Sequence, residues 1–87
     1  MPRVVFTHAV SDVPAWASHK AERAGFFADY ATDVVDYLPT DGGSTVAVSA
    51  NVHDMDGMLA ALQTPDAVAL EESHGVIQPI SSFVEGQ

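Results

Sequence analysis

Residues 6–16, FTHAVSDVPAW, combine the end of a strand, a tight corner and the first turn of a helix. A short apolar run, Val4-Val5-Phe6, leads into the corner and is rich in the β-branched and aromatic residues that strands favour. Ser11 or Asp12 can cap a helix, and Pro14 is compatible with its first turn. The corner therefore fixes where the first strand ends and where the chain turns back.

The rest of the chain continues in strands and helices that the periodicity of its apolar residues predicts. We expect strands over residues 3–10, 32–38, 45–52 and 78–85, with helices over about 13–24 and 55–74. Asp54 caps the second helical region, and Thr64-Pro65 breaks and restarts it. Gly75 ends that region. The predicted order is βαββαβ.

Short connections and right-handed crossovers leave few topologies for a βαββαβ chain. The commonest is the α+β ferredoxin-like sandwich, an antiparallel four-stranded sheet with two helices on one face. We expect one such domain over residues 1–87. The second face of its sheet is then bare and apolar.

The size of the chain predicts that this bare face is covered by a second copy. A chain of 87 residues buries roughly 60–65% of its unfolded surface, so its own core is modest. Apolar residues make up 47% of the sequence, and there is no cysteine to supply a disulfide or a thiolate metal site. We therefore expect a homodimer in which two sheets pair as a dimeric α/β barrel.

Charge and hydropathy exclude several classes of partner. The formal net charge is −9, with only three Lys and Arg residues, which excludes a nucleic-acid backbone or an anionic membrane surface as partner. No apolar run approaches about 18 residues, and no charged-then-apolar leader opens the chain. We expect a cytoplasmic protein.

Several short motifs resemble those of one protein group. They are HAVSDVPAW at residues 8–16, TPD at 64–66, ESHGV at 72–76 and PISSFVE at 79–85. These motifs are similar to those of the antibiotic biosynthesis monooxygenase-like group and its cyclase-like relatives, which are small dimeric α/β-barrel proteins. The resemblance covers nearly the whole chain. It implies the ferredoxin-like fold and an activity among cofactor-independent oxygenases of aromatic polyketides, haem-degrading oxygenases and aromatic cyclases.

The predicted topology brings His8, Trp16 and His74 to one end of the sheet. We interpret His8 as a general base, or as a hydrogen-bond donor to a phenol or enol oxygen, and His74 as a second catalytic residue. The alternatives are structural: His8 as a buried histidine bonded to backbone, Trp16 as a core residue, and His74 as a favourable cation at a helix C-terminus.

The predicted substrate-binding residues are Trp16, Lys20, Tyr37 and Asn51. Trp16 and Tyr37 would shape the wall of a pocket, while Asn51 either contacts the substrate or only bonds across the sheet.

A helical wheel places Lys20 inside the apolar stripe of the first helix and Arg23 on the other side. The apparent relatives often carry an aromatic residue at the position of Lys20. The ammonium group of Lys20 either extends past the helix edge, pairs with Asp33 or Asp36, or meets an anionic group in the pocket.

These residues together predict a homodimeric monooxygenase-like or cyclase-like protein that encloses an apolar or aromatic small molecule. Oxygenation without a cofactor is one candidate reaction. We predict no cofactor and no metal, because His8 and His74 without a nearby carboxylate make a poor metal site. The alternative is a non-catalytic dimer of the same fold that binds a small ligand or is purely structural.

Overall fold

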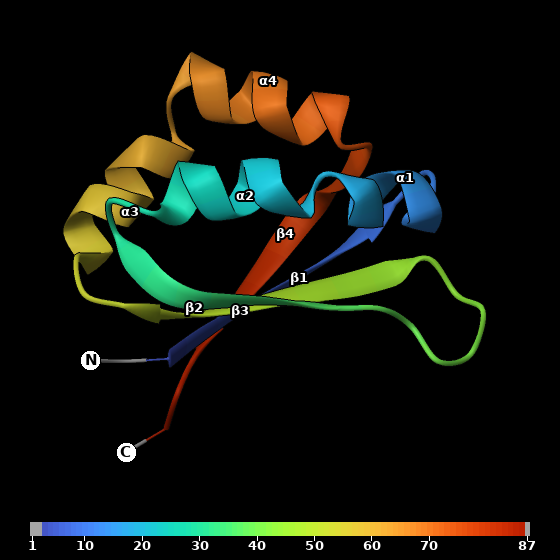
Figure 1. Ribbon diagram of the computed structural model, residues 1–87, viewed down its shortest axis with the longest axis horizontal. Helices are drawn as coiled ribbons and strands as arrows, with labels where there is room; N and C mark the ends of the chain where they lie inside the picture. Colours follow the sequence, from blue (N-terminus) through green and yellow to red (C-terminus); the bar gives the residue numbers. More distant parts are fainter. Residues whose placement is uncertain (1–2, 87) are drawn as a thin grey trace.

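The computed structural model describes residues 3–86. Its elements are β1 (Arg3–Val10), α1 (Val13–Ser18), α2 (Lys20–Phe27), β2 (Ala31–Tyr37), β3 (Thr45–Val52), α3 (Met55–Leu62), α4 (Pro65–Ser73) and β4 (Val76–Val84). The four strands form one sheet in the order β2-β3-β1-β4, and every neighbouring pair is antiparallel. The helices lie on one side of this sheet (Figure 1). The ferredoxin-like prediction is confirmed.

Strict alternation of buried side chains fixes which face of the sheet the helices cover. Along β1, every second residue from Val4 to Val10 is buried, and β3 pairs with it so that Phe6 faces Val48. Because successive side chains of a strand point to opposite faces, the even-numbered residues of β1 and β3 form one apolar layer under the helices. Arg3 and Asn51 pair in the same register and lie on the opposite face.

Side-chain caps define the starts of three helices, as the sequence predicts. Asp12, Asp54 and Thr64 each accept a hydrogen bond from the backbone N–H three residues later, at 3.1, 2.9 and 3.2 Å. Gly75 ends α4 with a φ of +75°, and a Cβ there would collide with the Ser11 hydroxyl. No helix within residues 3–86 is long and apolar enough to cross a bilayer.

The first helical region differs from the prediction. It is not continuous: the chain breaks at His19, whose φ and ψ of −93° and 17° separate α1 from α2. Lys20 is exposed, whereas Arg23 is buried. The placement of Lys20 in the inward stripe is therefore wrong, because the break resets the helix phase and turns Arg23 inward in its place.

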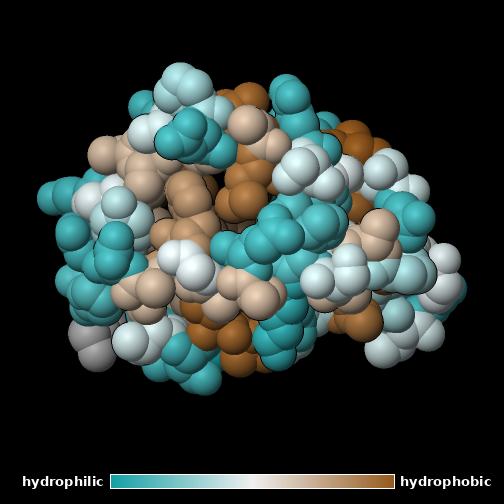
Figure 2. All heavy atoms as spheres, turned by 45° about the horizontal axis from the view of Figure 1, so that its top comes forward, coloured by the Kyte–Doolittle hydropathy of each residue, from teal (hydrophilic) through white to brown (hydrophobic). Residues whose placement is uncertain are grey.

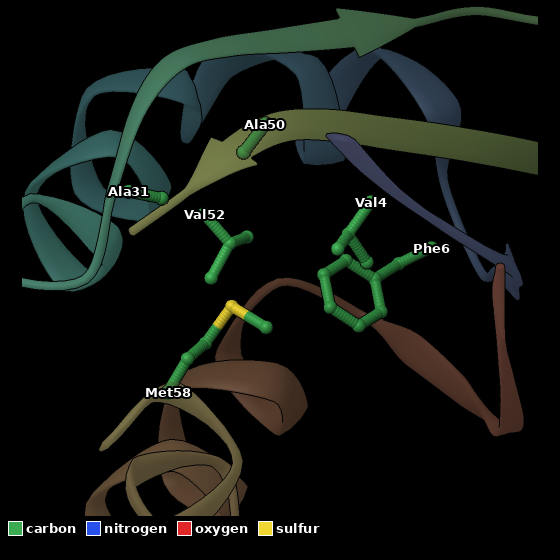
Figure 3. Close-up of a cluster of buried hydrophobic side chains, with 6 residues drawn as sticks. All are labelled: Val4, Phe6, Ala31, Ala50, Val52 and Met58. Carbon is green, nitrogen blue, oxygen red and sulfur yellow. The ribbon is translucent and has the colours of Figure 1, made fainter. Parts of the chain in front are cut away.

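Two groups of buried side chains fill the space between sheet and helices. In the first, Met58 of α3 projects onto the sheet towards Val52 and Phe6 (Figure 3). The second surrounds Trp16, which has no exposed surface. Phe6 and Trp16, one from each group, both line one pocket between the sheet and the helices.

Candidate functional site

A pocket of about 260 Å³ lies between the sheet and the helices. Its walls are largely apolar and come from both layers, for example Phe6 and Val48 from the sheet and Phe27, Leu59 and Leu70 from the helices. Apolar side chains show at the helix side of the molecule between more polar ones (Figure 2). Four ionisable residues also line the pocket: His8, Arg23, Glu71 and His74. An apolar cavity with a few polar groups is the usual form of a small-molecule site.

His8 projects from β1 into this pocket and is 9% exposed. Its Nδ1 lies 3.1 Å from the carbonyl oxygen of Ala9, which can only accept, so Nδ1–H donates and Nε2 is the unprotonated atom of the neutral ring. The ring packs edge-on against Trp16, with 5.9 Å between centroids. Burial lowers the pKa of His8, and the charge of Arg23 lowers it further, against the opposing effect of the Ala9 bond. His8 is thus held as a neutral base.

Arg23 forms the charged wall of the pocket and is 6% exposed. Its guanidinium carbon lies 3.7 Å from the centroid of Trp16, a cation–π stack. Its nitrogens donate to the carbonyl oxygen of Trp16 and to Oδ2 of Asp36, both at 2.7 Å. The Asp36 side chain is about as buried as the arginine, so neither charge is left without a counter-charge inside the protein.

His74 caps the C-terminus of α4 and is 4% exposed. Its Nε2 lies 3.1 Å from Oε2 of Glu22, and its Nδ1 lies 3.4 Å from Nη1 of Arg23. An arginine can only donate, so Nδ1 accepts and Nε2–H donates to the carboxylate. Hydrogen bonds from His19 and from His74 lower the pKa of Glu22.

Glu71 is an ionisable pocket residue that the sequence analysis missed. Burial raises the pKa of its carboxyl group, and its only polar contact among the described residues is a long one, 3.4 Å to Nε2 of Gln78. A carboxyl group in such surroundings holds its proton to a higher pH than an ordinary glutamate does. Nothing in the sequence marks it, because Glu71-Glu72 resembles any solvated helix face.

The predicted site residues lie in three different places. His8, Trp16 and His74 come together at the pocket, which confirms their predicted clustering, while their chemical roles stay predictions. Tyr37 and Asn51 lie on the opposite face of the sheet. Lys20 is exposed on α2 and is absent from the pocket wall.

The placement of Tyr37 and Asn51 corrects their prediction as substrate contacts. The Tyr37 hydroxyl is 2.9 Å from the hydroxyl of Ser49, and Oδ1 of Asn51 accepts from Nη1 of Arg3 at 3.0 Å. Arg3 also donates to the Ser49 hydroxyl at 2.8 Å. Asn51 therefore bonds across the sheet, which was the structural alternative, and these residues form one polar network on the helix-free face.

The cation that lines the pocket is Arg23, which the helical wheel places on the other side of the helix. Arg23 follows Trp16 by seven residues, but the break at His19 lies between them, so this spacing alone does not predict the stacking of its guanidinium on the indole.

Replacing Asp36 tests whether the buried ion pair supports the site. We expect Asp36→Asn to lower the free energy of unfolding by about 3–5 kcal/mol, because it leaves the Arg23 charge buried without a counter-charge. Urea denaturation measures the loss. The double variant Arg23→Met/Asp36→Leu should recover most of it, since a well-packed apolar pair carries no desolvation penalty.

Asp33→Asn is the matched control, because Asp33 pairs with Arg3 at 3.1 Å but its side chain is 62% exposed. Its φ of 55° also suits asparagine. We expect a loss below about 1 kcal/mol there. Equal losses in Asp36→Asn and Asp33→Asn would contradict the role given to the buried pair.

The whole chain shares its fold with solved structures of one group. SnoaB, a cofactor-independent oxygenase from Streptomyces nogalater, is 20% identical with a TM-score of 0.72, over 99% of this chain and 93% of that one. A provisionally assigned antibiotic biosynthesis monooxygenase from Bordetella bronchiseptica is 11% identical with a TM-score of 0.75, over 99% and 95%. One from Nitrosomonas europaea is 11% identical with a TM-score of 0.65, over 100% and 98%.

No protein-family model and no curated protein matches the sequence. At these identities the structures share a fold and do not establish a reaction. The chain has the ferredoxin-like fold of the antibiotic biosynthesis monooxygenase structures along its full length, as its motifs predict.

Proposed function

We propose that this protein encloses a small aromatic molecule in the pocket and oxygenates it without a cofactor, with Nε2 of His8 as the general base. One observation carries the proposal: the Nδ1–H of His8 is engaged by the Ala9 carbonyl, so the ring presents an unprotonated nitrogen in an apolar cavity. A general base needs a fixed tautomer and a neutral ring. His8 has both.

The ligand is expected to carry an acidic hydroxyl group on an apolar body. His8 Nε2 would accept the proton of a phenol or enol, and the positive charge of Arg23 on the same wall would stabilise the resulting anion. The cavity, at about 260 Å³, is near the lower end of the range for ligand pockets, roughly 300 Å³. A compound of one or two fused rings suits this volume.

The reaction of such an anion with oxygen needs few protein groups. Its electrons delocalise onto a ring carbon, which attacks O₂ and forms a carbon–oxygen bond. The peroxide then takes the proton from His8, and loss of one water from the hydroperoxide leaves a carbonyl where a ring C–H stood. Molecular oxygen is the only oxidant, and the protein supplies a base, a cation and a dry cavity. The existence of a cofactor-independent oxygenase on the same fold, SnoaB, supports this route.

Replacing His8 with glutamine tests the proposal. We expect His8→Gln to keep ligand binding but to lower oxygen uptake by about 10²-fold or more, the usual contribution of a general base. Trp16 is the only tryptophan of the chain and lines the pocket, so quenching of its fluorescence by hydroxylated one- and two-ring aromatics reports binding directly. Because burial lowers the pKa of His8, wild-type uptake should stay constant as the pH falls to about 6.5 and decline only below it.

His53→Gln is the control, since His53 is exposed and lies outside the pocket wall; it should match the wild type in both assays. Saturable quenching with no oxygen uptake by the wild-type protein would favour the alternative, a non-catalytic ligand-binding dimer. The absence of quenching by any compound would overturn the binding proposal itself.

We further infer that the protein is a homodimer joined through the helix-free face of the sheet. The large apolar residues Tyr37, Ile77 and Phe83 are 45–58% exposed, and their strand partners place them on that face. Pairing the faces of two copies would bury this apolar surface and complete a core that is small in one chain.

Placing a charge at this face tests the dimer. We expect Phe83→Glu to weaken self-association at least tenfold, about 1.4 kcal/mol, because each copy would bring an unpaired carboxylate into the interface. Sedimentation velocity over a concentration series measures the change. Val68→Glu is the control, because Val68 lies on α4 and its side chain is already 46% exposed. This variant should leave self-association unchanged. A wild-type protein that stays monomeric at high micromolar concentration would refute the inference.

A further inference from the structure

A second cluster of side chains lies beside the pocket, on the far side of His74. It consists of His19, Glu22 and His74. Nδ1 of His19 is 3.0 Å from one oxygen of the Glu22 carboxylate, and Nε2 of His74 is 3.1 Å from the other. The three ligand atoms lie within 4.8 Å of one another. One carboxylate is thus flanked by two imidazoles whose bonding nitrogens point at it.

The break between α1 and α2 creates this arrangement. His19 is the junction residue, and Glu22 follows it by three positions on the same helical face. His74 reaches the cluster from the C-terminal end of α4, more than fifty positions along the chain. Two helices that only the fold brings together therefore supply the three side chains.

We propose that His19, Glu22 and His74 bind one divalent transition-metal ion of the Zn²⁺ type. Two imidazoles and one carboxylate are a common zinc ligand set, and three protein ligands leave a fourth position for water. With bonds of about 2.0–2.2 Å, tetrahedral ligand atoms lie about 3.3 Å apart, close to the nitrogen–oxygen separations already present. Imidazole ligands favour zinc, cobalt and nickel over magnesium and calcium.

The cluster can close on an ion without disturbing the core. His74 is 4% exposed and stays fixed, whereas the side chains of His19 and Glu22 are 31% and 55% exposed. The His19 ring now stacks on that of His74, at 14° and 4.4 Å, and has to turn out of this stack to direct Nδ1 at the ion. An exposed side chain can make that turn at little cost.

Arg23 keeps its two shortest hydrogen bonds when an ion binds to His74. Metal on Nε2 moves the proton of His74 to Nδ1, which ends the contact with Nη1 of Arg23. That contact, at 3.4 Å, is the longest of the arginine's three; those to the Trp16 carbonyl and to Asp36, at 2.7 Å each, remain. The neighbouring Asp36 carboxylate offsets the guanidinium charge, so the cation does not face an unpaired positive group.

Titration of the untagged, EDTA-treated protein with ZnCl₂ in a calorimeter tests the proposal. We expect saturable binding of one ion per chain, because the described residues hold one such cluster. His19→Ala and Glu22→Gln should each weaken binding at least tenfold while the far-ultraviolet circular dichroism is unchanged, since both side chains lie at the surface. Co²⁺ substitution should give the visible absorption of a tetrahedral complex.

His53→Ala is the matched control, because it removes an exposed histidine outside the cluster, and it should bind as the wild type does. Zinc should also raise the melting temperature of the wild type and of His53→Ala more than that of the two cluster variants. No saturable binding, or binding that His53→Ala weakens as much as His19→Ala does, would overturn the site. The proposal does not depend on the oxygenase reaction, since each readout uses the protein and the metal alone.

Discussion

The part of the fold around the pocket depends on the contacts of the buried Arg23 guanidinium. It stacks on the ring of Trp16, bonds to the last turn of α1 through the Trp16 carbonyl, pairs with Asp36 on β2 and contacts His74 at the end of α4. One side chain thereby joins three elements around its own helix. Burying a charge costs several kcal/mol, and only a partner as buried as Asp36 makes the arrangement stable.

The charge of Arg23 also affects the protonation of His8. Arg23 and burial act in one direction on His8, lowering its pKa and keeping the ring neutral beside an apolar cavity. The Ala9 carbonyl then selects the tautomer. A base and a cation on one wall are what proton abstraction from a hydroxyl group needs, because the base receives the proton while the cation stabilises the anion.

The sequence predicted the fold well because strands and caps are local features. Alternation of apolar residues located the inward face of β3, and Asp54, Thr64 and Gly75 marked helix ends whose geometry the structure reproduces. The predicted gathering of His8, Trp16 and His74 followed from topology alone. Local periodicity was sufficient for these features since each depends on only a few neighbouring residues.

The site was harder to predict because its remaining parts depend on contacts between distant segments. A helical wheel assumes a continuous helix and cannot reveal the break at His19. Because of this break, Arg23 faces inward and Lys20 is exposed. Asn51 alternates with the inward valines of β3, so strict period-two reasoning places it on the helix-free face, against its assignment as a ligand contact. The desolvation of Glu71 exists only in the folded pocket.

The central claim is that His8 is a neutral imidazole with its proton on Nδ1 and its lone pair on Nε2. A long-range ¹H–¹⁵N correlation spectrum of the uniformly labelled protein distinguishes the two tautomers and the protonated ring, with His8→Gln assigning the signals. We predict the Nδ1–H tautomer for His8 at neutral pH, unchanged on mild acidification. A proton on Nε2, or a doubly protonated ring at neutral pH, would contradict it.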